Sequence, residues 1–457
     1  MRILFASAEF TPVARVGGLA EAAAGLVHAL RAAGVTVDLV LPDYGDVELA
    51  DQSESSIDVP WWVGEVRLRH GTHPVAGAVT LVDVPGMARP HPYVDADGSG
   101  WPDNDHRFMA FSAVVAALAE RERPDVVHLN DWHTAAALGM MTDRPPTVLT
   151  IHTLGYQGVT AREWLTHLPV EAHRFAWYDG TNPLAGAIEL ADRVIAVSPN
   201  YAREIVTPEG GMGLHERLAS LGDRLVGIRN GIDTAVWDPA TDPHIAARFT
   251  AGDDDGRVAC RAALHDRAGW DDDKRPIVAV VSRLVEQKGI DLLADAARFL
   301  PTMPARLMVL GAGDAATAGA LRELADDAPD TAWFFEGYDE PLAHELFAGS
   351  DLFAMPSRFE PCGLAQMQAM AYGSIPVVTD VGGLHDTVLD ADRHKDGNGF
   401  VSPVEPAGIV DALHRGVRAV KLASRRRALQ RRGMGTDWSW EGPAAEHVAV
   451  YEEVAGA

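Results

Sequence analysis

The turn Ser357-Arg358-Phe359-Glu360-Pro361-Cys362-Gly363-Leu364 joins an apolar segment, Asp351–Pro356, to a helix-like segment, Ala365–Tyr372. Strand, turn and helix in this order form the repeating unit of a parallel α/β sheet. In such sheets ligands bind beyond the carboxyl ends of the strands, where the amides that begin the next helix favour ligand oxygen atoms. Glu360 is therefore the first candidate for contact with a substrate. The alternative is a carboxylate that only complements the helix dipole.

Short β-branched runs alternate with Ala- and Leu-rich runs along the whole chain, which predicts parallel sheets covered by helices. The runs fall into two series, so we expect an α/β protein with two doubly wound, Rossmann-like domains. The strands expected in the first series are Arg2–Ala6, Thr36–Leu41, Val79–Val84, Asp125–Leu129, Thr147–Ile151, Arg193–Val197 and Leu225–Ile228. Those expected in the second series are Ile277–Ser282, Arg306–Leu310, Ala332–Phe335, Asp351–Met355 and Ile375–Thr379.

The length of 457 residues exceeds what one hydrophobic core normally supports. Between the two series, Pro239 and Pro243 interrupt regular structure and indicate a hinge. We therefore predict a first domain over residues 1–238, a second over residues 239–432, and a central crevice that both domains face. Residues 433–457 are expected to form a last helix that returns to the first domain.

The bulk composition excludes several kinds of partner. A net charge of −26 argues against nucleic acid and anionic membranes, because binding to either requires an excess of Lys and Arg. The two cysteines, Cys260 and Cys362, offer neither a disulfide framework nor a metal-ligand spacing. No signal peptide or membrane-spanning stretch is expected, so a reducing cytoplasm fits best. The oligomeric state is left open.

The loop Thr11–Leu19 follows the first expected strand and leads directly into a helix. Its paired glycines, Gly17 and Gly18, allow a ligand to approach amides at the positive end of that helix. The loop lacks the dinucleotide-binding glycine pattern, so a plain tight turn is an equal alternative. Arg15 favours an anion, and a phosphate is the natural one.

Two further cations, Arg283 and Lys288, follow the first strand of the second series. Cations at a strand end can stabilise a departing diphosphate. The alternative is an exposed pair at the start of a helix. The glycine turn Gly311–Asp314 is weaker evidence, because strand-to-helix geometry often requires such a turn.

Polar groups gather where two strands of the first series end. One segment is His128-Leu129-Asn130-Asp131-Trp132-His133, and the other runs from Thr150 to Gly158 and contains His152. Such a density of hydrogen-bonding groups suits a polyhydroxylated ligand. Buried structural histidines are the competing interpretation.

No metal is predicted. The acid-x-acid pairs Asp95-Ala96-Asp97 and Asp390-Ala391-Asp392 lie among glycines and charges rather than at the end of an apolar strand, which is typical of solvated loops. The basic run Arg425–Arg427, with Arg431 and Arg432, is interpreted as an exposed helix face or as a set of ion-pair partners.

In their order along the chain, five motifs resemble the bacterial glycogen synthase and plant starch synthase family, retaining glucosyltransferases of the GT-B type with two Rossmann-like domains. The resemblance covers essentially the whole chain. The motifs are Arg15-Val16-Gly17-Gly18-Leu19, His152 with Gly155-Tyr156-Gln157-Gly158, Asn230-Gly231-Ile232-Asp233, Ser282-Arg283-Leu284 with Gln287-Lys288-Gly289, and Glu360-Pro361-Cys362-Gly363-Leu364.

The resemblance implies transfer of glucose from ADP-glucose to the non-reducing end of an α-1,4-glucan with retention of configuration. ADP-glucose is then a donor substrate, and no cofactor is expected. The catalytic residues implied are Arg283 and Lys288 on the diphosphate, Glu360 on the transferred glucose, and Asp131 and His152 on glucose or the acceptor. The substrate-binding residues implied are Arg15, Gly17, Gly18, Asn230, Tyr338 near the adenine, and Cys362, Gly363 and Leu364.

Three positions depart from the family pattern: Arg15 replaces the usual Lys, Glu21 the usual Asp, and Thr153 the usual Asn. Their effect on rate and acceptor preference is left open. One rival function is a UDP-sugar-dependent or maltoside-forming transferase of the same fold. The expected ribose-binding Glu of such an enzyme is Gln368 here, which favours an adenine donor. A second rival is a non-catalytic glucan-binding protein.

Overall fold

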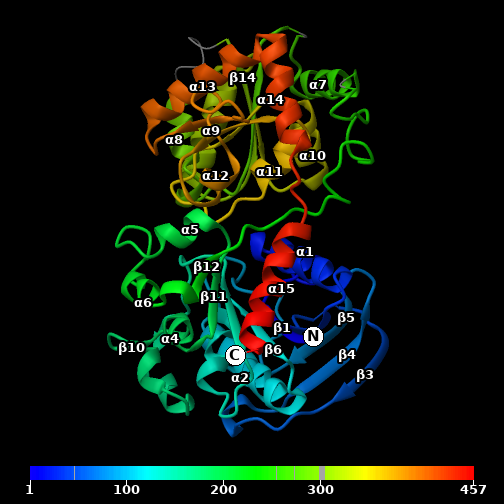
Figure 1. Ribbon diagram of the computed structural model, residues 1–457. Coiled ribbons are helices and arrows are strands. Elements are labelled where there is room, and N and C mark those ends of the chain that lie inside the picture. Colours follow the sequence, from blue (N-terminus) through cyan, green and yellow to red (C-terminus); the bar gives the residue numbers. More distant parts are fainter. Residues whose placement is uncertain (46, 254, 272, 298–303, 457) are drawn as a thin grey trace. The chain divides into compact units, whose positions relative to one another are not determined.

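The computed structural model describes residues 1–45, 47–253, 255–271, 273–297 and 304–456. The chain divides into two compact units (Figure 1). Unit 1 comprises Met1–Gly231 together with the segment from Trp440 onward, and unit 2 comprises Ile232–Ser439.

A nine-stranded sheet forms the centre of unit 1, in the order β12-β11-β7-β6-β1-β2-β5-β4-β3. The strands from β12 to β5 are parallel, whereas β4 and β3 add an antiparallel extension at one edge. The strands of this sheet are β1 (Arg2–Ala6), β2 (Thr36–Pro42), β3 (Ala50–Ser55), β4 (Arg67–His73), β5 (Gly77–Asp83), β6 (Val126–Asn130), β7 (Thr147–Ile151), β11 (Arg193–Ala196) and β12 (Leu225–Gly227). A small second sheet contains β8 (Thr160–Ala161), β10 (Gly180–Thr181) and β9 (Ala176–Trp177).

Helices of unit 1 turn apolar faces toward this sheet, so that β1 and β6 are almost completely buried. The helices are α1 (Gly18–Ala32), α2 (Asn104–Glu122), α3 (Trp132–Ala135), α4 (Pro183–Leu190), α5 (Pro199–Glu204), α6 (His215–Ala219) and α15 (Glu441–Ala455). The short 3₁₀ turns are η1 (Trp61–Val63), η2 (Ala136–Gly139), η3 (Arg162–His167), η4 (Ala172–Phe175) and η5 (Gly222–Arg224).

Unit 2 contains a fully parallel six-stranded sheet in the order β15-β14-β13-β16-β17-β18. The strands are β13 (Ile277–Val281), β14 (Arg306–Gly311), β15 (Ala332–Glu336), β16 (Leu352–Met355), β17 (Ile375–Thr379) and β18 (Phe400–Ser402). The helical elements are α7 (Asp255–Ala268), η6 (Glu286–Lys288), α8 (Ile290–Ala297), α9 (Ala315–Asp327), α10 (Glu340–Gly349), α11 (Ala365–Ala371), α12 (Gly382–Thr387), α13 (Pro406–Val420) and α14 (Ala423–Gly435). The doubly wound α/β architecture predicted from the alternating pattern is confirmed in each unit.

The segment expected to act as a hinge packs onto unit 2. Trp237 stacks on His344, with ring centroids 4.0 Å apart and planes inclined by 12°. One carboxylate oxygen of Asp242 accepts hydrogen bonds from His344 Nδ1 at 2.7 Å and from the Tyr372 hydroxyl at 2.6 Å. Because this segment is anchored by a stacked ring and a buried polar cluster, unit 2 begins at Ile232, before the prolines that suggested residue 239.

The last helix, α15, belongs to unit 1 and lies beside α1 (Figure 1). Its buried positions include Ala444, His447, Tyr451 and Val454, spaced by three or four residues as on one helix face. The Tyr451 hydroxyl lies 2.7 Å from Nδ1 of His128 on β6. The helix α14 continues to Gly435, so the expected division at residue 432 falls within its last turn.

Candidate active site

In unit 2 the turn between β16 and α11 buries Glu360, which is 5% exposed. Lys288 Nζ donates to Glu360 Oε2 at 2.6 Å, and the Ser357 hydroxyl donates to the same oxygen at 3.0 Å. The structure therefore brings together two residues that are 72 positions apart and that were predicted to contact different parts of a substrate. A buried carboxylate with two donors on one oxygen is rigidly oriented, because breaking either contact leaves a polar group unsatisfied.

Two close backbone approaches hold this turn. At Gly382, where φ is +43°, a Cβ atom would lie 1.9 Å from the Glu360 carbonyl oxygen. At Gly289, where φ is +62°, a Cβ atom would lie 2.0 Å from the Pro356 carbonyl oxygen. Gly383 N also donates to the Glu360 carbonyl at 3.0 Å. The loops after β13 and β17 are thus fastened to the main chain around Glu360, and only glycine permits these contacts.

The loop after β13 is tied to the same turn through polar contacts as well. Arg358 N donates to the Gln287 carbonyl at 2.8 Å, and Gln287 Nε2 donates to the Phe359 carbonyl at 3.3 Å. The Arg358 guanidinium makes a two-pronged ion pair with Asp291, at 2.7 and 2.6 Å. These contacts explain how Lys288 reaches Glu360.

Arg283 and Tyr338, from the same expected site, are exposed at the ends of two strands of one sheet, β13 and β15, which are separated by β14. Arg283 follows β13, and within the described ranges no hydrogen bond or ion pair engages its guanidinium. Tyr338 follows β15, is 72% exposed, and donates from its hydroxyl to Glu340 at 2.8 Å. The parallel strands β13, β14 and β15 end at the same sheet edge, so both side chains are presented there.

The segment Cys362–Leu364 leads into α11. The carbonyls of Cys362 and Gly363 accept from Gln366 Nε2 at 3.1 and 3.0 Å. Leu364 is the N-cap residue of α11, and no side chain caps that helix. The amides that begin α11 therefore have no side-chain acceptor at the cap.

In unit 1 the loop before α1 is organised by Glu9, a residue that sequence reasoning missed. Glu9 Oε2 accepts from the amides of Val16 and Gly17 at 2.8 and 2.9 Å, while Glu9 Oε1 accepts from the Tyr93 hydroxyl at 2.8 Å. The Gly17 amide is thus engaged within the protein. The helix begins at Gly18 with no side-chain cap, and uncapped amides at a helix start favour an anionic ligand. An acidic residue three positions after a buried strand was the available signal.

Two of the departures from the family pattern are partners. Arg15 Nη2 and Glu21 Oε1 form an ion pair at 2.6 Å, and each side chain is about one-third exposed or less, at 32% and 26%. Both substitutions lengthen the side chain, Lys to Arg and Asp to Glu, so the pair keeps its charges with a different reach.

Asp131 and His152 meet at the ends of β6 and β7. Asp131 has a φ of +52°, and its Oδ1 accepts from the amide of His152 at 2.7 Å and from that of Thr153 at 3.4 Å. His152 Nε2 donates to Asn130 Oδ1 at 2.9 Å. A non-glycine residue with positive φ is strained, which is common where a side chain must be aimed for function.

Burial sets the charge of both groups. Desolvation raises the pKa of Asp131 to about 7, against the amide hydrogen bonds from His152 and Thr153 and with a contribution from Glu9. Desolvation lowers the pKa of His152 to about 3. The imidazole is therefore neutral, and the carboxyl group of Asp131 exchanges a proton near neutral pH. A pair of this kind both accepts from and donates to the hydroxyl groups of a ligand.

Asn230 lies beyond β12, near the end of unit 1, and is 7% exposed. Its main-chain carbonyl accepts from Arg229 Nη1 at 2.8 Å.

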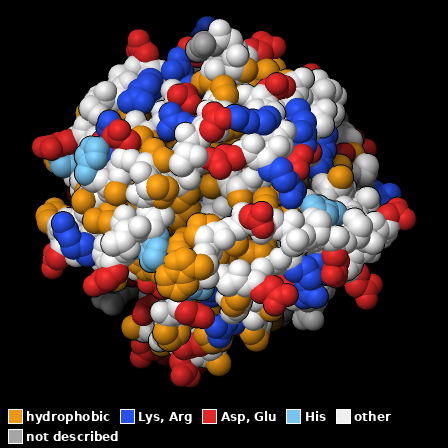
Figure 2. Space-filling view, turned by 90° about the horizontal axis from the view of Figure 1, so that it is seen from below, with side chains coloured by type: hydrophobic (Ala, Val, Ile, Leu, Met, Phe, Trp, Pro, Cys, Tyr) orange, Lys and Arg blue, Asp and Glu red, His pale blue; other side chains and the backbone are white. Residues whose placement is uncertain are grey.

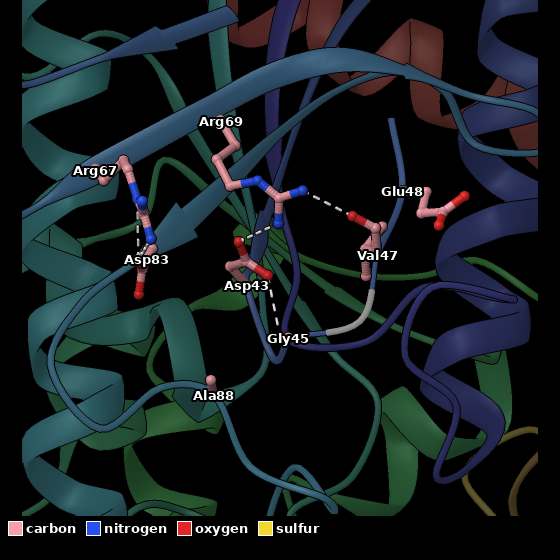
Figure 3. A pocket seen from close by; sticks show the side chains of 8 residues that line it. All are labelled: Asp43, Gly45, Val47, Glu48, Arg67, Arg69, Asp83 and Ala88. Atoms are coloured by element: carbon pink, nitrogen blue, oxygen red, sulfur yellow. Dashed lines mark hydrogen bonds and ion pairs between the residues drawn. The ribbon is translucent and has the colours of Figure 1, made fainter. Parts of the chain in front are cut away.

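No residue of the predicted site lines the cavity in Figure 3, which has a volume of about 520 Å³ and lies near the end of β2. The arginines of that cavity are paired, Arg69 with Asp43 and Arg67 with Asp83, each at 2.6 Å.

The other charged motifs are engaged within the protein. Asp390 and Asp392 accept from Arg415 at 2.8 and 3.1 Å, and Asp392 also accepts from Arg425. Part of the basic run in α14 therefore pairs with an acidic loop, as one of the two interpretations proposed. In the part of the chain that the structure describes, no helix has the length and apolarity needed to cross a bilayer.

Two doubly wound units with polar and charged groups at their strand ends are the architecture of glycosyltransferases of the GT-B class. The sequence profile described as starch synthase catalytic domain matches residues 2–220, and that described as glycosyl transferases group 1 matches residues 275–418. The chain belongs to the glycogen synthase and starch synthase family.

Similar proteins support this assignment over the full length. The chain is 42% identical to a glycogen synthase from Halorhodospira halophila and 40% identical to one from Thioalkalivibrio sulfidiphilus, covering 99% of this chain and 99% and 100% of the relatives. The catalytic domain of starch synthase IV from Arabidopsis thaliana, solved bound to ADP and acarbose, is similar in structure with a TM-score of 0.89 and 30% identity, covering 100% of this chain and 99% of that one. A sucrose-phosphate synthase from Thermosynechococcus elongatus shares the fold, with a TM-score of 0.65 and 19% identity over 100% of this chain and 99% of its own.

Proposed function

We propose that this chain transfers glucose from ADP-glucose to the non-reducing end of an α-1,4-glucan and retains the α configuration. The observation that carries the proposal is the buried Lys288–Glu360 pair at the end of β16, held by Ser357 and by two glycine approaches. Its support from known proteins is that full-length relatives are named glycogen synthases and that a similar starch synthase was solved with ADP and acarbose.

In the proposed reaction unit 2 binds the donor. Departure of the diphosphate from C1 of glucose builds negative charge, and Arg283 and Lys288 are the cations assigned to stabilise it. Arg283 is exposed and has no ionic partner among the described residues, so it is available to an anion. Lys288 is held by Glu360, which orients the ammonium before the donor arrives.

Glu360 is assigned to the glucose hydroxyls rather than to nucleophilic attack. Its Oε2 already accepts from Lys288 and Ser357, which lowers the availability of that oxygen for bond formation. Its other oxygen remains the acceptor for a sugar hydroxyl. The leaving phosphate is proposed to take the proton of the acceptor hydroxyl, so that attack occurs on the face from which the diphosphate departs.

Unit 1 is proposed to bind the glucan hydroxyls through Asp131 and neutral His152. The raised pKa of Asp131, about 7 because of burial, leaves a protonated fraction that donates a hydrogen bond. The amide of Gly18, at the uncapped start of α1, and Arg15, oriented by Glu21, are assigned to an oxygen of the donor phosphates. Asn230 is assigned to a sugar hydroxyl.

The donor base is proposed to be adenine. Tyr338 offers an exposed ring face for stacking at the end of β15. Gln368 stands at the sequence position where the family resemblance expects the ribose-binding Glu of a uridine-donor enzyme, and it is buried within α11. The nucleotide sugar is consumed as a substrate.

We propose the reducing cytoplasm as the location of the protein. Both cysteines are free thiols, which fits that proposal.

Purified protein incubated with radiolabelled ADP-glucose and glycogen tests the proposal. We expect label in the polymer, released as glucose by an enzyme specific for α-1,4 links, and much less label from UDP-glucose. Equal or preferred use of UDP-glucose would replace the adenine assignment. Tight glycogen binding without transfer from any donor would make the chain a glucan-binding protein.

A further inference from the structure

Large aromatic side chains are exposed on unit 1 outside the candidate active site. Trp61 is 89% exposed and Tyr178 is 86% exposed, the two highest values for large hydrophobic residues in the described ranges. Tryptophan is usually buried to a large extent, so such exposure needs an explanation. Hydrophobic side chains also gather over part of the face shown in Figure 2, with charged side chains around them.

Trp61 stands on a rigid base. It begins the 3₁₀ turn η1, in which Val63 is fully buried and Trp62 is half-buried. The Trp62 ring meets the Trp164 ring edge-on at 5.4 Å and the His167 ring at 4.9 Å. Trp164 is fixed in turn, because its Nε1 donates to Asp105 at 2.9 Å. The exposed indole therefore projects from a packed aromatic cluster rather than from a flexible loop.

Tyr178 is held in place by contacts with Trp177 and with Arg162 of η3. It lies in the turn between β9 and β10 with a φ of +51°, and its ring meets the Trp177 ring edge-on at 5.3 Å. Arg162, the first residue of η3, donates to the Tyr178 carbonyl at 3.2 Å. Because η3 also carries Trp164, this one short element contacts both Trp62, the neighbour of Trp61, and the main chain of Tyr178.

We propose that Trp61, Tyr178 and the η3 segment between them form an accessory binding site for a segment of α-glucan chain, named here the aromatic platform. The apolar C–H faces of pyranose rings pack on the negative face of an aromatic ring, while their hydroxyl groups need hydrogen-bonding partners at the rim. The exposed side chains of Arg162, Glu163 and Asp179 supply such partners.

The negative charge of the protein favours a neutral glucan over a charged polymer on this surface. The protein carries a net charge of −26, and the rim contains two carboxylates and one arginine, so a polyanion is disfavoured. A neutral, polyhydroxylated polymer carries no charge to repel. The inference rests on the proposed function for its choice of α-glucan, since a polymeric acceptor has many internal segments besides the chain end that reacts.

The benefit of such a site is a raised local concentration of chain ends. When one segment of a polymer is bound on the platform, delivery of its ends to the active site becomes effectively intramolecular. A short acceptor cannot engage both sites, and it gains nothing. The platform therefore changes the use of glycogen and leaves the use of maltotriose unchanged.

The test measures glycogen affinity without donor, by electrophoresis in gels containing glycogen, for Trp61→Ala, Tyr178→Ala and the double variant. We expect about tenfold weaker binding for the double variant and intermediate values for the single ones. Trp61→Tyr keeps a ring and should retain most of the affinity. Val75→Ala removes a half-exposed hydrophobic side chain from another turn of unit 1 and should bind as the unaltered protein does. Both altered residues are exposed, so melting temperatures should not change.

Two further measurements decide the outcome. With ADP-glucose, the double variant should show a several-fold higher apparent KM for glycogen and unchanged rates on maltotriose. Unchanged glycogen affinity together with normal transfer overturns the platform and leaves the proposed function intact. Loss of self-association in sedimentation, with unchanged glycogen affinity, would assign the surface to a second copy of the chain and also overturn it. If no donor supports transfer, the gel measurement still decides whether the platform binds glucan.

Discussion

Replacing Lys288 by Ala tests the central pair of the proposed site. The substitution removes the ammonium that lies 2.6 Å from Glu360 Oε2, where the lysine side chain is 18% and the glutamate side chain 6% exposed. Two consequences are expected. The reaction loses a preorganised cation at the departing diphosphate, and a buried carboxylate loses its counter-charge.

The two effects have different magnitudes. Loss of one preorganised charge-stabilising donor costs about 2.7–4 kcal/mol of barrier, or about 100- to 1,000-fold in kcat. Loss of one partner from a buried ion pair costs about 3–5 kcal/mol of stability, and we expect the lower end because the Ser357 hydroxyl still donates to Glu360. Glycogen affinity should change by less than about threefold, since the other donors and acceptors that we assign to the glucan lie in unit 1.

Steady-state transfer from ADP-glucose to glycogen and equilibrium unfolding in urea measure the two effects. The matched control is the double variant Lys288→Met with Glu360→Gln, which has no unpaired buried charge. It should recover most of the stability and none of the turnover. A Lys288→Ala protein with turnover within about threefold of the unaltered enzyme would refute the reasoning, because the diphosphate would then be held elsewhere.

Three other perturbations have defined outcomes. Gly382→Ala places a Cβ atom 1.9 Å from the Glu360 carbonyl oxygen at a φ of +43°, so we expect lower stability and little transfer. The control is Gly319→Ala in α9, where a Cβ atom would have no neighbour within 4 Å; it should be neutral or stabilising by about 1 kcal/mol in urea unfolding. Burial raises the pKa of the Asp131 carboxyl to about 7, so the unfolded chain loses this proton at lower pH than the folded protein, and the unaltered protein loses stability as pH rises from 4 to 7. The Asp131→Asn variant has no such proton, so its free energy of unfolding relative to the unaltered protein should rise by up to about 4 kcal/mol over that range. A difference that stays constant with pH would contradict the burial argument. Arg15→Ala should raise the KM for ADP-glucose about tenfold, because it removes a cation assigned to the donor phosphates. The double variant Arg15→Lys with Glu21→Asp keeps both charges, so its KM should stay within about threefold of that of the unaltered protein. An equal rise in KM for both variants would show that the length of the side chain, not its charge, governs this contact.

Most of the fold was predictable because buried parallel strands are continuous apolar runs. All twelve expected strands are present, with ends shifted by a few residues. The strand β3, Ala50–Ser55, was missed because its sequence is polar and its residues are all exposed. At the edge of a sheet, pairing with β4 rather than burial stabilises the strand, and composition gives little sign of that. The short β18 was missed for lack of length.

The placement of the candidate residues at strand ends was predictable from the sequence, whereas their contacts were not. The apolar runs that precede them placed Glu360, Lys288, Asp131 and His152 after strand ends, and the structure also places them there. The position of Glu9 shortly after a buried strand was a signal that a polar group lies there, but it did not show that Glu9 would bind the amides of the loop before α1. That contact depends on how the chain folds back after β1, which local pattern does not encode.

From its sequence alone this protein is a pair of doubly wound α/β domains with an ordered set of glycosyltransferase motifs, because strand and helix periodicity and short motifs are local properties of a chain. Tertiary structure alone decided that Lys288 holds Glu360, that Arg15 holds Glu21, and that Asp131 titrates near pH 7. Each of these depends on angstrom-scale distances, and the Lys288–Glu360 contact and the burial of Asp131 arise only when strand ends from distant parts of the sequence are packed side by side.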